Sequence, residues 1–129
     1  MSARTDPVLT PVKMAHVVLR TAKFGPMVAF WRTVLGARVV SEHPNLVLLS
    51  YDSEHHRIAI THYPHAKTAG FAYAGLDHVA FTFGSLQQLM AAYQQRKARG
   101  ILPSWSVHHG TTISMYCKSH FSSDASPTG

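Results

Sequence analysis

The feature that most constrains the fold is a repeat in the order of predicted secondary structure. A β-branched segment, a helix and further short strands follow one another twice along the 129 residues. The two opening segments, residues 13–21 and 76–83, share the pattern His-Val-Val/Ala-Leu/Phe. Their histidines, His16 and His78, stand 62 residues apart (78 − 16). A repeat of this length predicts a duplicated supersecondary unit.

The first half of the repeat, residues 13–63, contains a clear helix after its opening strand. Proline is favoured at the first helical position and glycine after the last one, so a helix is predicted from Gly25-Pro26 to Gly36. Apolar side chains recur inside it at helical spacing, namely Met27, Phe30, Trp31, Val34 and Leu35. Three short strands are predicted next, over residues 37–41, 46–51 and 57–62.

The second half, residues 76–118, repeats this order after a connector over residues 64–75. Ser85 and Gln88 have capping-box spacing and predict the start of a helix that ends at Gly100. Strands are predicted near residues 103–107 and 111–118. The counterpart of the fourth strand would follow Lys118. Residues 119–129 contain one aromatic side chain among serines and a proline, which disfavours a strand.

The fold class that follows is α+β, with paired βαβββ modules that form a curved, partly open sheet with the helices outside. The last strand of the second module is missing or atypical. Residues 1–12 form a flexible arm, residues 13–118 a single domain with modules over about 13–63 and 76–118, and residues 119–129 an irregular tail. A sheet without its last strand exposes backbone donors and acceptors, which predicts a homodimer.

Alternation along the strands predicts which side chains share a face. His16 and His78 fall opposite the apolar side chains of their strands. The same reasoning puts Tyr116 on the side opposite Ile113, Met115 and Cys117, and Arg57, Ala59 and Thr61 opposite Ile58 and Ile60. The prediction is a polar-lined concavity that contains two histidines and a tyrosine.

Composition narrows the classes of function. Cys117 is the single cysteine, so no internal disulfide can form and a reducing, cytoplasmic setting is expected. No apolar stretch is long enough to cross a bilayer, so no membrane partner is expected. The net charge of +6 favours either solubility or anionic ligands. The basic residues of the chain are scattered, apart from a cluster at residues 96–99, so nucleic acid is not an expected partner.

Three segments resemble the vicinal oxygen chelate superfamily, which includes glyoxalase I, bleomycin-resistance proteins and extradiol dioxygenases. They are DSEHHRIAI (52–60), LDHVAFTFGSL (76–86) and HHGTTISMY (108–116), and they look most like single-module proteins related to extradiol dioxygenases. The resemblance covers residues 13–118. It implies that His16 and His78 bind Fe(II) or another divalent metal, with a glutamate on the final strand as third ligand.

The chain departs from the extradiol pattern at its end. His109, Met115 and Tyr116 match the first half of the family's signature, but Ser119 and His120 stand where an acidic residue and a proline belong. No glutamate follows, and Asp124 is a poor substitute. Glyoxalase I activity is not expected either, because Ala59 occupies the position of its required carboxylate.

Three functions remain open. The first is a dioxygenase-like enzyme for a catecholic or polyphenolic substrate, with His16 and His78 on the metal, His109 moving protons and Tyr116 bonding a substrate oxygen. The second is a metal-free isomerase, lyase or cyclase that uses the same histidines and tyrosine. The third is a protein that binds a small, anionic aromatic compound.

Explanations without a functional site are also open. His16 and His78 could be ordinary hydrogen-bonded residues, and a truncated or alternatively spliced reading could have removed the last strand. His55, His56 and His65 are expected to be solvated in turns.

Overall fold

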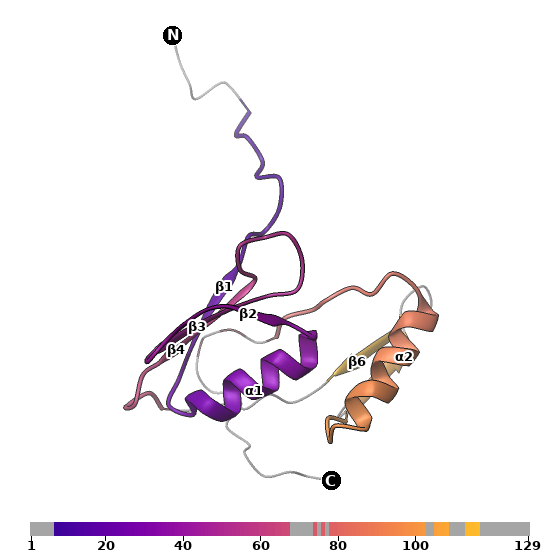
Figure 1. The fold of residues 1–129 in the computed structure, drawn as a ribbon. Helices are drawn as coiled ribbons and strands as arrows, with labels where there is room; N and C mark the ends of the chain where they lie inside the picture. Colours follow the sequence, from indigo (N-terminus) through magenta and orange to yellow (C-terminus); the bar gives the residue numbers. More distant parts are fainter. Residues whose placement is uncertain are drawn as a thin grey trace.

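The computed structural model describes residues 7–67, 74, 76 and 78–102, together with the backbone of residues 105–108 and 113–116. It is a mixed α+β structure, as the sequence predicts (Figure 1). The elements in chain order are β1 (Val17–Thr21), α1 (Phe24–Leu35), β2 (Arg38–His43), β3 (Leu46–Ser50), β4 (Ile58–His62), α2 (Leu86–Lys97), β5 (Trp105–His108) and β6 (Ile113–Tyr116).

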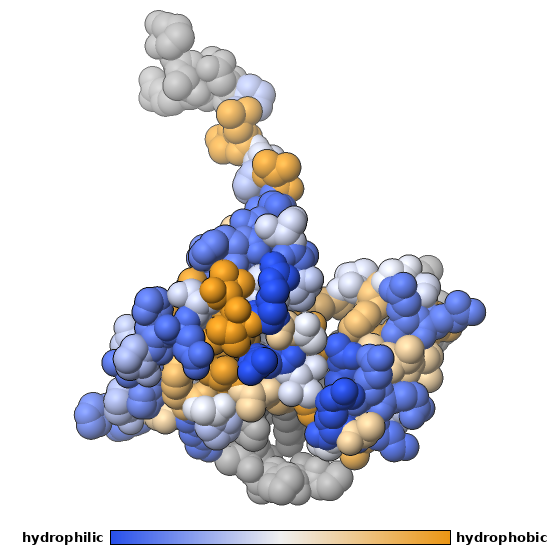
Figure 2. Space-filling model, viewed as in Figure 1, coloured by the Kyte–Doolittle hydropathy of each residue, from blue (hydrophilic) through white to orange (hydrophobic). Residues whose placement is uncertain are grey.

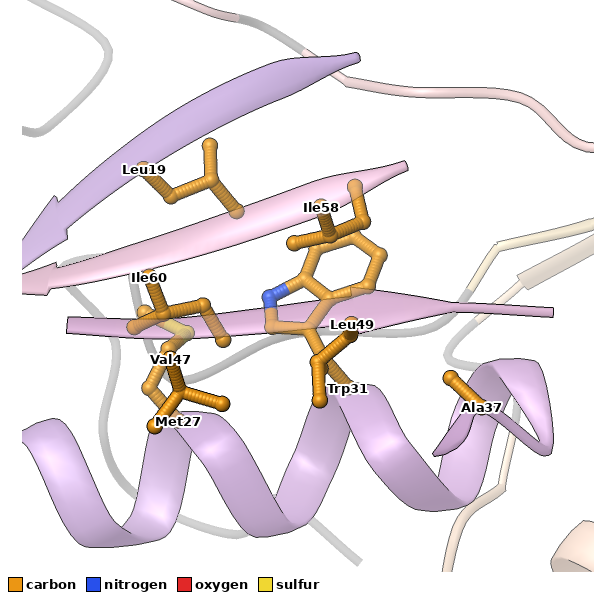
Figure 3. Close-up of a cluster of buried hydrophobic side chains, with 8 residues drawn as sticks. All are labelled: Leu19, Met27, Trp31, Ala37, Val47, Leu49, Ile58 and Ile60. Carbon is orange, nitrogen blue, oxygen red and sulfur yellow. The ribbon is translucent and has the colours of Figure 1, made fainter. Parts of the chain in front are cut away.

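The first half forms a four-stranded sheet in the order β1-β4-β3-β2. Strand β4 is parallel to β1 and antiparallel to β3, so it joins the opening strand to the β2–β3 hairpin. Helix α1 covers one face, where Met27 and Trp31 pack against the sheet (Figure 3). The sheet contributes the buried side chains of Leu19, Val47, Leu49, Ile58 and Ile60.

The ends of α1 agree closely with the prediction. The helix starts at Phe24, one residue before the predicted Gly25-Pro26 pair. Gly36 ends it in the left-handed conformation, with φ of 60°, which residues other than glycine rarely adopt. Its backbone N–H and that of Ala37 bond to the carbonyls of Thr33 and Arg32.

The second half is less complete. Ser85 caps α2 and accepts a hydrogen bond from the Gln88 N–H at 3.1 Å, which confirms the predicted helix start. Strands β5 and β6 form a separate two-stranded sheet. The prediction of a strand over residues 76–83 is wrong for residues 78–83, which join no sheet.

Helix α2 is anchored to α1 through a few side chains. The Arg96 guanidinium donates two hydrogen bonds to the Val34 carbonyl, at 2.7 and 3.0 Å, and lies 5.5 Å from the centre of the Phe83 ring. Phe81 is half-buried against the core, with its ring centre 6.2 Å from that of Trp31. These contacts hold the segment before α2 near the first half, although it forms no strand.

The chain before β1 is an extended arm. Val8 and Leu9 are almost completely exposed, and Figure 2 shows apolar side chains along the arm as it leaves the sheet. None of the described helices is long and apolar enough to cross a membrane.

Candidate functional site

The candidate site lies on the face of the four-stranded sheet opposite α1, which we call the open face. Leu19 and Thr21 of β1 are buried towards the helix, whereas Val18 and Arg20 are exposed on the other side. The same alternation continues back to His16, whose side chain is exposed. His16 therefore lies opposite Leu19, as the sequence predicts.

The centre of the open face is made of small and apolar side chains. Ala59 of β4 pairs with Val18 on one side and Leu48 on the other. Ala59 is only 2% exposed, although it lies outside the core cluster under α1, so its larger neighbours shield it. This arrangement provides a shallow apolar surface beside His16.

Three imidazoles gather at the start of β1, and we call His16, His55 and His56 the imidazole cluster. The ring centres of His16 and His56 lie 4.0 Å apart, with their planes tilted by 40°. The Nδ1 atoms of His55 and His56 lie 2.9 Å apart, within hydrogen-bonding distance. The Val17 N–H bonds to the Arg57 carbonyl at 3.0 Å, so the strand pairing itself brings these histidines together.

Charged side chains fix the turn that carries His55 and His56. The Arg57 guanidinium bonds to the Asp52 carboxylate at 2.9–3.2 Å and donates to the carbonyls of Met14 and Ala15. One arginine thus ties the turn before β4 to the chain before β1. A Lys13–Glu54 ion pair of 2.8 Å joins the same two segments.

The environment shifts the pKa values of several of these groups. Burial lowers the pKa of His56, and the neighbouring imidazoles of His16 and His55 lower it further. The hydrogen bond from Arg57 lowers the pKa of Asp52, and that from Lys13 lowers the pKa of Glu54. The turn that carries His55 and His56 therefore holds two carboxylates that favour the ionised form, while His56 favours the neutral form.

Of the other predicted site residues, only His78 has a described side chain. His78 is exposed on the segment before α2. Tyr116 ends β6, but only its backbone is described, and His109 lies outside the described residues. In the described part of the chain, no three His, Cys, Asp or Glu side chains form a group that could hold a metal. These residues alone do not complete the ligand set that the resemblance implies.

His56 is the site residue that the sequence analysis missed. It is predicted to be solvated in a turn, yet its ring is half-buried against His16. The signal was the position of the His-His pair directly before a buried strand that runs parallel to the strand after His16. Parallel pairing brings the starts of both strands to the same edge of the site.

Sequence comparison finds two similar curated proteins. Biphenyl-2,3-diol 1,2-dioxygenase 2 of Rhodococcus globerulus is 41% identical over 105 residues, which are 81% of this chain and 55% of that protein. Biphenyl-2,3-diol 1,2-dioxygenase 3 of the same organism is 41% identical over 112 residues, 84% of this chain and 57% of that protein. The chain therefore spans about half the length of these curated relatives.

Solved structures match the fold at low sequence identity. A lactoylglutathione lyase from Agrobacterium tumefaciens superposes with a TM-score of 0.68 at 15% identity, over 87% of this chain and 89% of that one. A possible glyoxalase from Bacillus cereus gives 0.60 at 16% identity, over 84% and 93%. The family model described as Glyoxalase/Bleomycin resistance protein/Dioxygenase superfamily matches residues 13–121. Because this match covers most of the chain, the protein belongs to that superfamily.

Proposed function

We propose that this protein is an extradiol-type dioxygenase that cleaves the ring of a catecholic or polyphenolic small molecule. The observation that carries the proposal is 41% identity, over 81% of the chain, to an enzyme named for its action on biphenyl-2,3-diol. The open face supports it, because the imidazole cluster stands beside an apolar surface that an aromatic ring could cover.

We propose that the cofactor is Fe(II) or another divalent metal, bound by His16 and His78. The third ligand would come from residues outside the described part, from a partner chain or from solvent. When such a metal is bound, it would supply Lewis-acid activation of a catechol that binds next to these histidines.

The chain's own residues would position the substrate and move its proton. Val18, Ala59 and Leu48 would support the aromatic ring. His56 would accept a proton from a hydroxyl group next to His16, because the two rings are 4.0 Å apart. His109 and Tyr116 keep the roles that the resemblance implies, a second proton carrier and a hydrogen-bond donor to a substrate oxygen.

The test is ring cleavage of 2,3-dihydroxybiphenyl by protein reconstituted anaerobically with Fe(II) and then exposed to oxygen. We expect a coloured ring-opened product and consumption of one O2 per substrate. The His16→Ala variant should lose both metal binding and turnover, and His56→Asn should lower kcat by about 100-fold or more while it keeps the metal. His43→Ala is the control, because His43 is exposed on β2 and bonds to Ser41. Metal binding that is unchanged in a His16→Ala, His78→Ala double variant would contradict the proposed ligands.

A metal-free isomerase, lyase or cyclase is the second candidate. The lack of a three-ligand group among the described residues favours it. Turnover of a catechol or polyketide-like compound that survives exhaustive chelation, and is lost in His56→Asn or His109→Ala, would identify this chemistry. Loss of all turnover on chelation would exclude it.

We also propose that the protein is a homodimer in the cytoplasm. Among the described strands β1 pairs with β4 alone, so its outer edge presents unpaired backbone groups that a second copy could bond. Sedimentation equilibrium should give twice the chain mass of 14.2 kDa. The single cysteine favours a reducing compartment, which cell fractionation tests.

A further inference from the structure

The open face continues beyond the imidazole cluster to a second, positively charged end. His16, Val18 and Arg20 alternate along the same side of the chain. At about 3.3 Å per residue, the Cα atoms of His16 and Arg20 lie roughly 13 Å apart along the chain. Val18 is 55% exposed between them. A ligand that reaches from His16 to Arg20 would therefore cross an apolar surface.

Arg20 lines a hollow of about 530 Å³ at this end of the face. Its guanidinium lies 5.6 Å from the centre of the Tyr63 ring, which follows β4. His65 and Lys67 also line the hollow, and none of its described lining residues is a carboxylate. Within the described part of the chain, neither Arg20 nor Lys67 forms an ion pair. The hollow thus gathers positive charge that nothing described there neutralises.

The chemistry of these side chains selects the ligand group. A guanidinium matches a carboxylate with two parallel hydrogen bonds, and the aromatic ring of Tyr63 keeps it oriented at little entropic cost. Lys67 adds a second positive charge. A neutral aromatic ring would form no ion pair with Arg20 or Lys67 at this end.

We propose that the hollow binds a carboxylate at the far end of the substrate, so that the enzyme prefers catechols that carry an anionic group at the end of the ring system opposite the chelating oxygens. The inference rests on the proposed function for the catechol end. The carboxylate end stands on Arg20, Tyr63 and Lys67 alone and can be tested separately.

The kinetic test compares 2′,3′-dihydroxybiphenyl-4-carboxylate with neutral 2,3-dihydroxybiphenyl. For the unaltered protein we expect a kcat/KM at least tenfold higher for the carboxylate, mainly through KM, because the contact is remote from the reacting atoms. Arg20→Met should remove most of this preference and leave kcat/KM for the neutral substrate unchanged. Arg20→Lys should keep part of it, and Tyr63→Leu should weaken it less than Arg20→Met does.

A binding test needs no turnover. Calorimetry with biphenyl-4-carboxylate, which lacks both hydroxyls, should give an affinity that falls about tenfold in Arg20→Met and with added salt. Arg99→Met is the matched control, because it removes the same charge from an exposed residue in the turn after α2, whose guanidinium donates a hydrogen bond to the Gln95 carbonyl. Circular dichroism checks that each variant is folded.

The outcomes separate the two proposals. If both catechols are cleaved and Arg20→Met leaves the ratio of their kcat/KM values unchanged within twofold, the proposed carboxylate site is wrong and the proposed function stands. If no catechol is cleaved but the affinity for biphenyl-4-carboxylate depends on Arg20, the proposed function is wrong and the proposed carboxylate site is supported. An equal loss of affinity in Arg99→Met would indicate a general effect of net charge and would contradict the proposed carboxylate site.

Discussion

The two halves of the chain are predicted to contain similar elements in the same order, but their strands pair into sheets of different size. In the first half, β4 lies between β1 and β3 and makes one sheet of four strands. In the second half, β5 and β6 pair only with each other, and residues 78–83 join no strand in the described part of the chain. The difference coincides with the one element that the sequence does not predict in the second half, a counterpart of β4.

The helices of the two halves show the same contrast. Helix α1 buries Met27 and Trp31 against the sheet. Helix α2 buries only Ala92, and its apolar side chains Leu86 and Met90 are 55% and 44% exposed. Of the two described helices, the one that packs on a four-stranded sheet is thus the better buried.

The largest expected effect tests where the stability lies. Leu49→Ala removes a fully buried side chain from the first half and should lower the free energy of unfolding by about 2–5 kcal/mol. Leu86→Ala in the second half should change it by less than about 0.5 kcal/mol, because Leu86 is largely exposed. Urea denaturation measures both values. Equal losses would contradict the contrast between the halves.

The next effect tests whether a fourth strand is what the second half lacks. Replacing residues 119–124 with the sequence RIAITH, which stands at residues 57–62, should give residues 79–83 a partner. Their amide hydrogen exchange should slow at least tenfold, about 1.4 kcal/mol. A control copy with serine in place of both isoleucines should have no such effect. Unchanged exchange with the intact copy would show that some other feature keeps the second half open.

A smaller and more local effect is expected at the start of α2. Ser85→Ala removes the side chain that accepts the Gln88 N–H and should destabilise the helix by about 1 kcal/mol. Hydrogen exchange should quicken within residues 86–90 and stay unchanged in β3 and β4, because the two halves share few contacts. Ser85→Asp, which can still cap the helix, should restore protection. Faster exchange throughout the first half would mean that the halves unfold together.

The smallest effect concerns the ion pair that supports the imidazole cluster. The hydrogen bond from Arg57 lowers the pKa of Asp52 below its ordinary value of 3.8, so the folded state binds this proton less tightly than the unfolded state does. The stabilisation is complete above that ordinary value and is lost as the pH falls through the lowered pKa. Asp52→Asn should therefore cost stability at pH 7 and little below pH 3, as thermal unfolding at both pH values can measure. Because the Asp52 side chain is 35% exposed, solvent screens part of this contribution.

Local signals made most of the first half predictable. Gly36 and the apolar spacing from Met27 to Trp31 identify α1, and the alternation in residues 58–60 identifies a strand whose isoleucines face the core. The capping pair Ser85 and Gln88 likewise identifies α2. These features depend on side chains that are neighbours in sequence, which is why the sequence alone reveals them.

The remaining features depend on contacts between distant segments. Residues 78–83 have the alternation of a strand, but a strand also needs a partner, and alternation says nothing about whether one exists. His56 appears in the sequence as one of ten histidines. Its place beside His16 follows only from the parallel register that pairs Val17 with Ile58. The predicted ligands His16 and His78 and the predicted catalytic residues His109 and Tyr116 stay predictions that metal binding and kinetics can decide.

The parallel pairing of β1 with β4 also determines the order in which the chain can fold. Val17 and Ile58 are 41 residues apart (58 − 17), whereas the β2–β3 and β3–β4 pairs are joined by short connections. During synthesis the hairpins can form as soon as they leave the ribosome, but β1 must wait until β4 has emerged. The imidazole cluster forms only when this long-range pairing forms, so we expect the site to be assembled later than the β2–β3 hairpin.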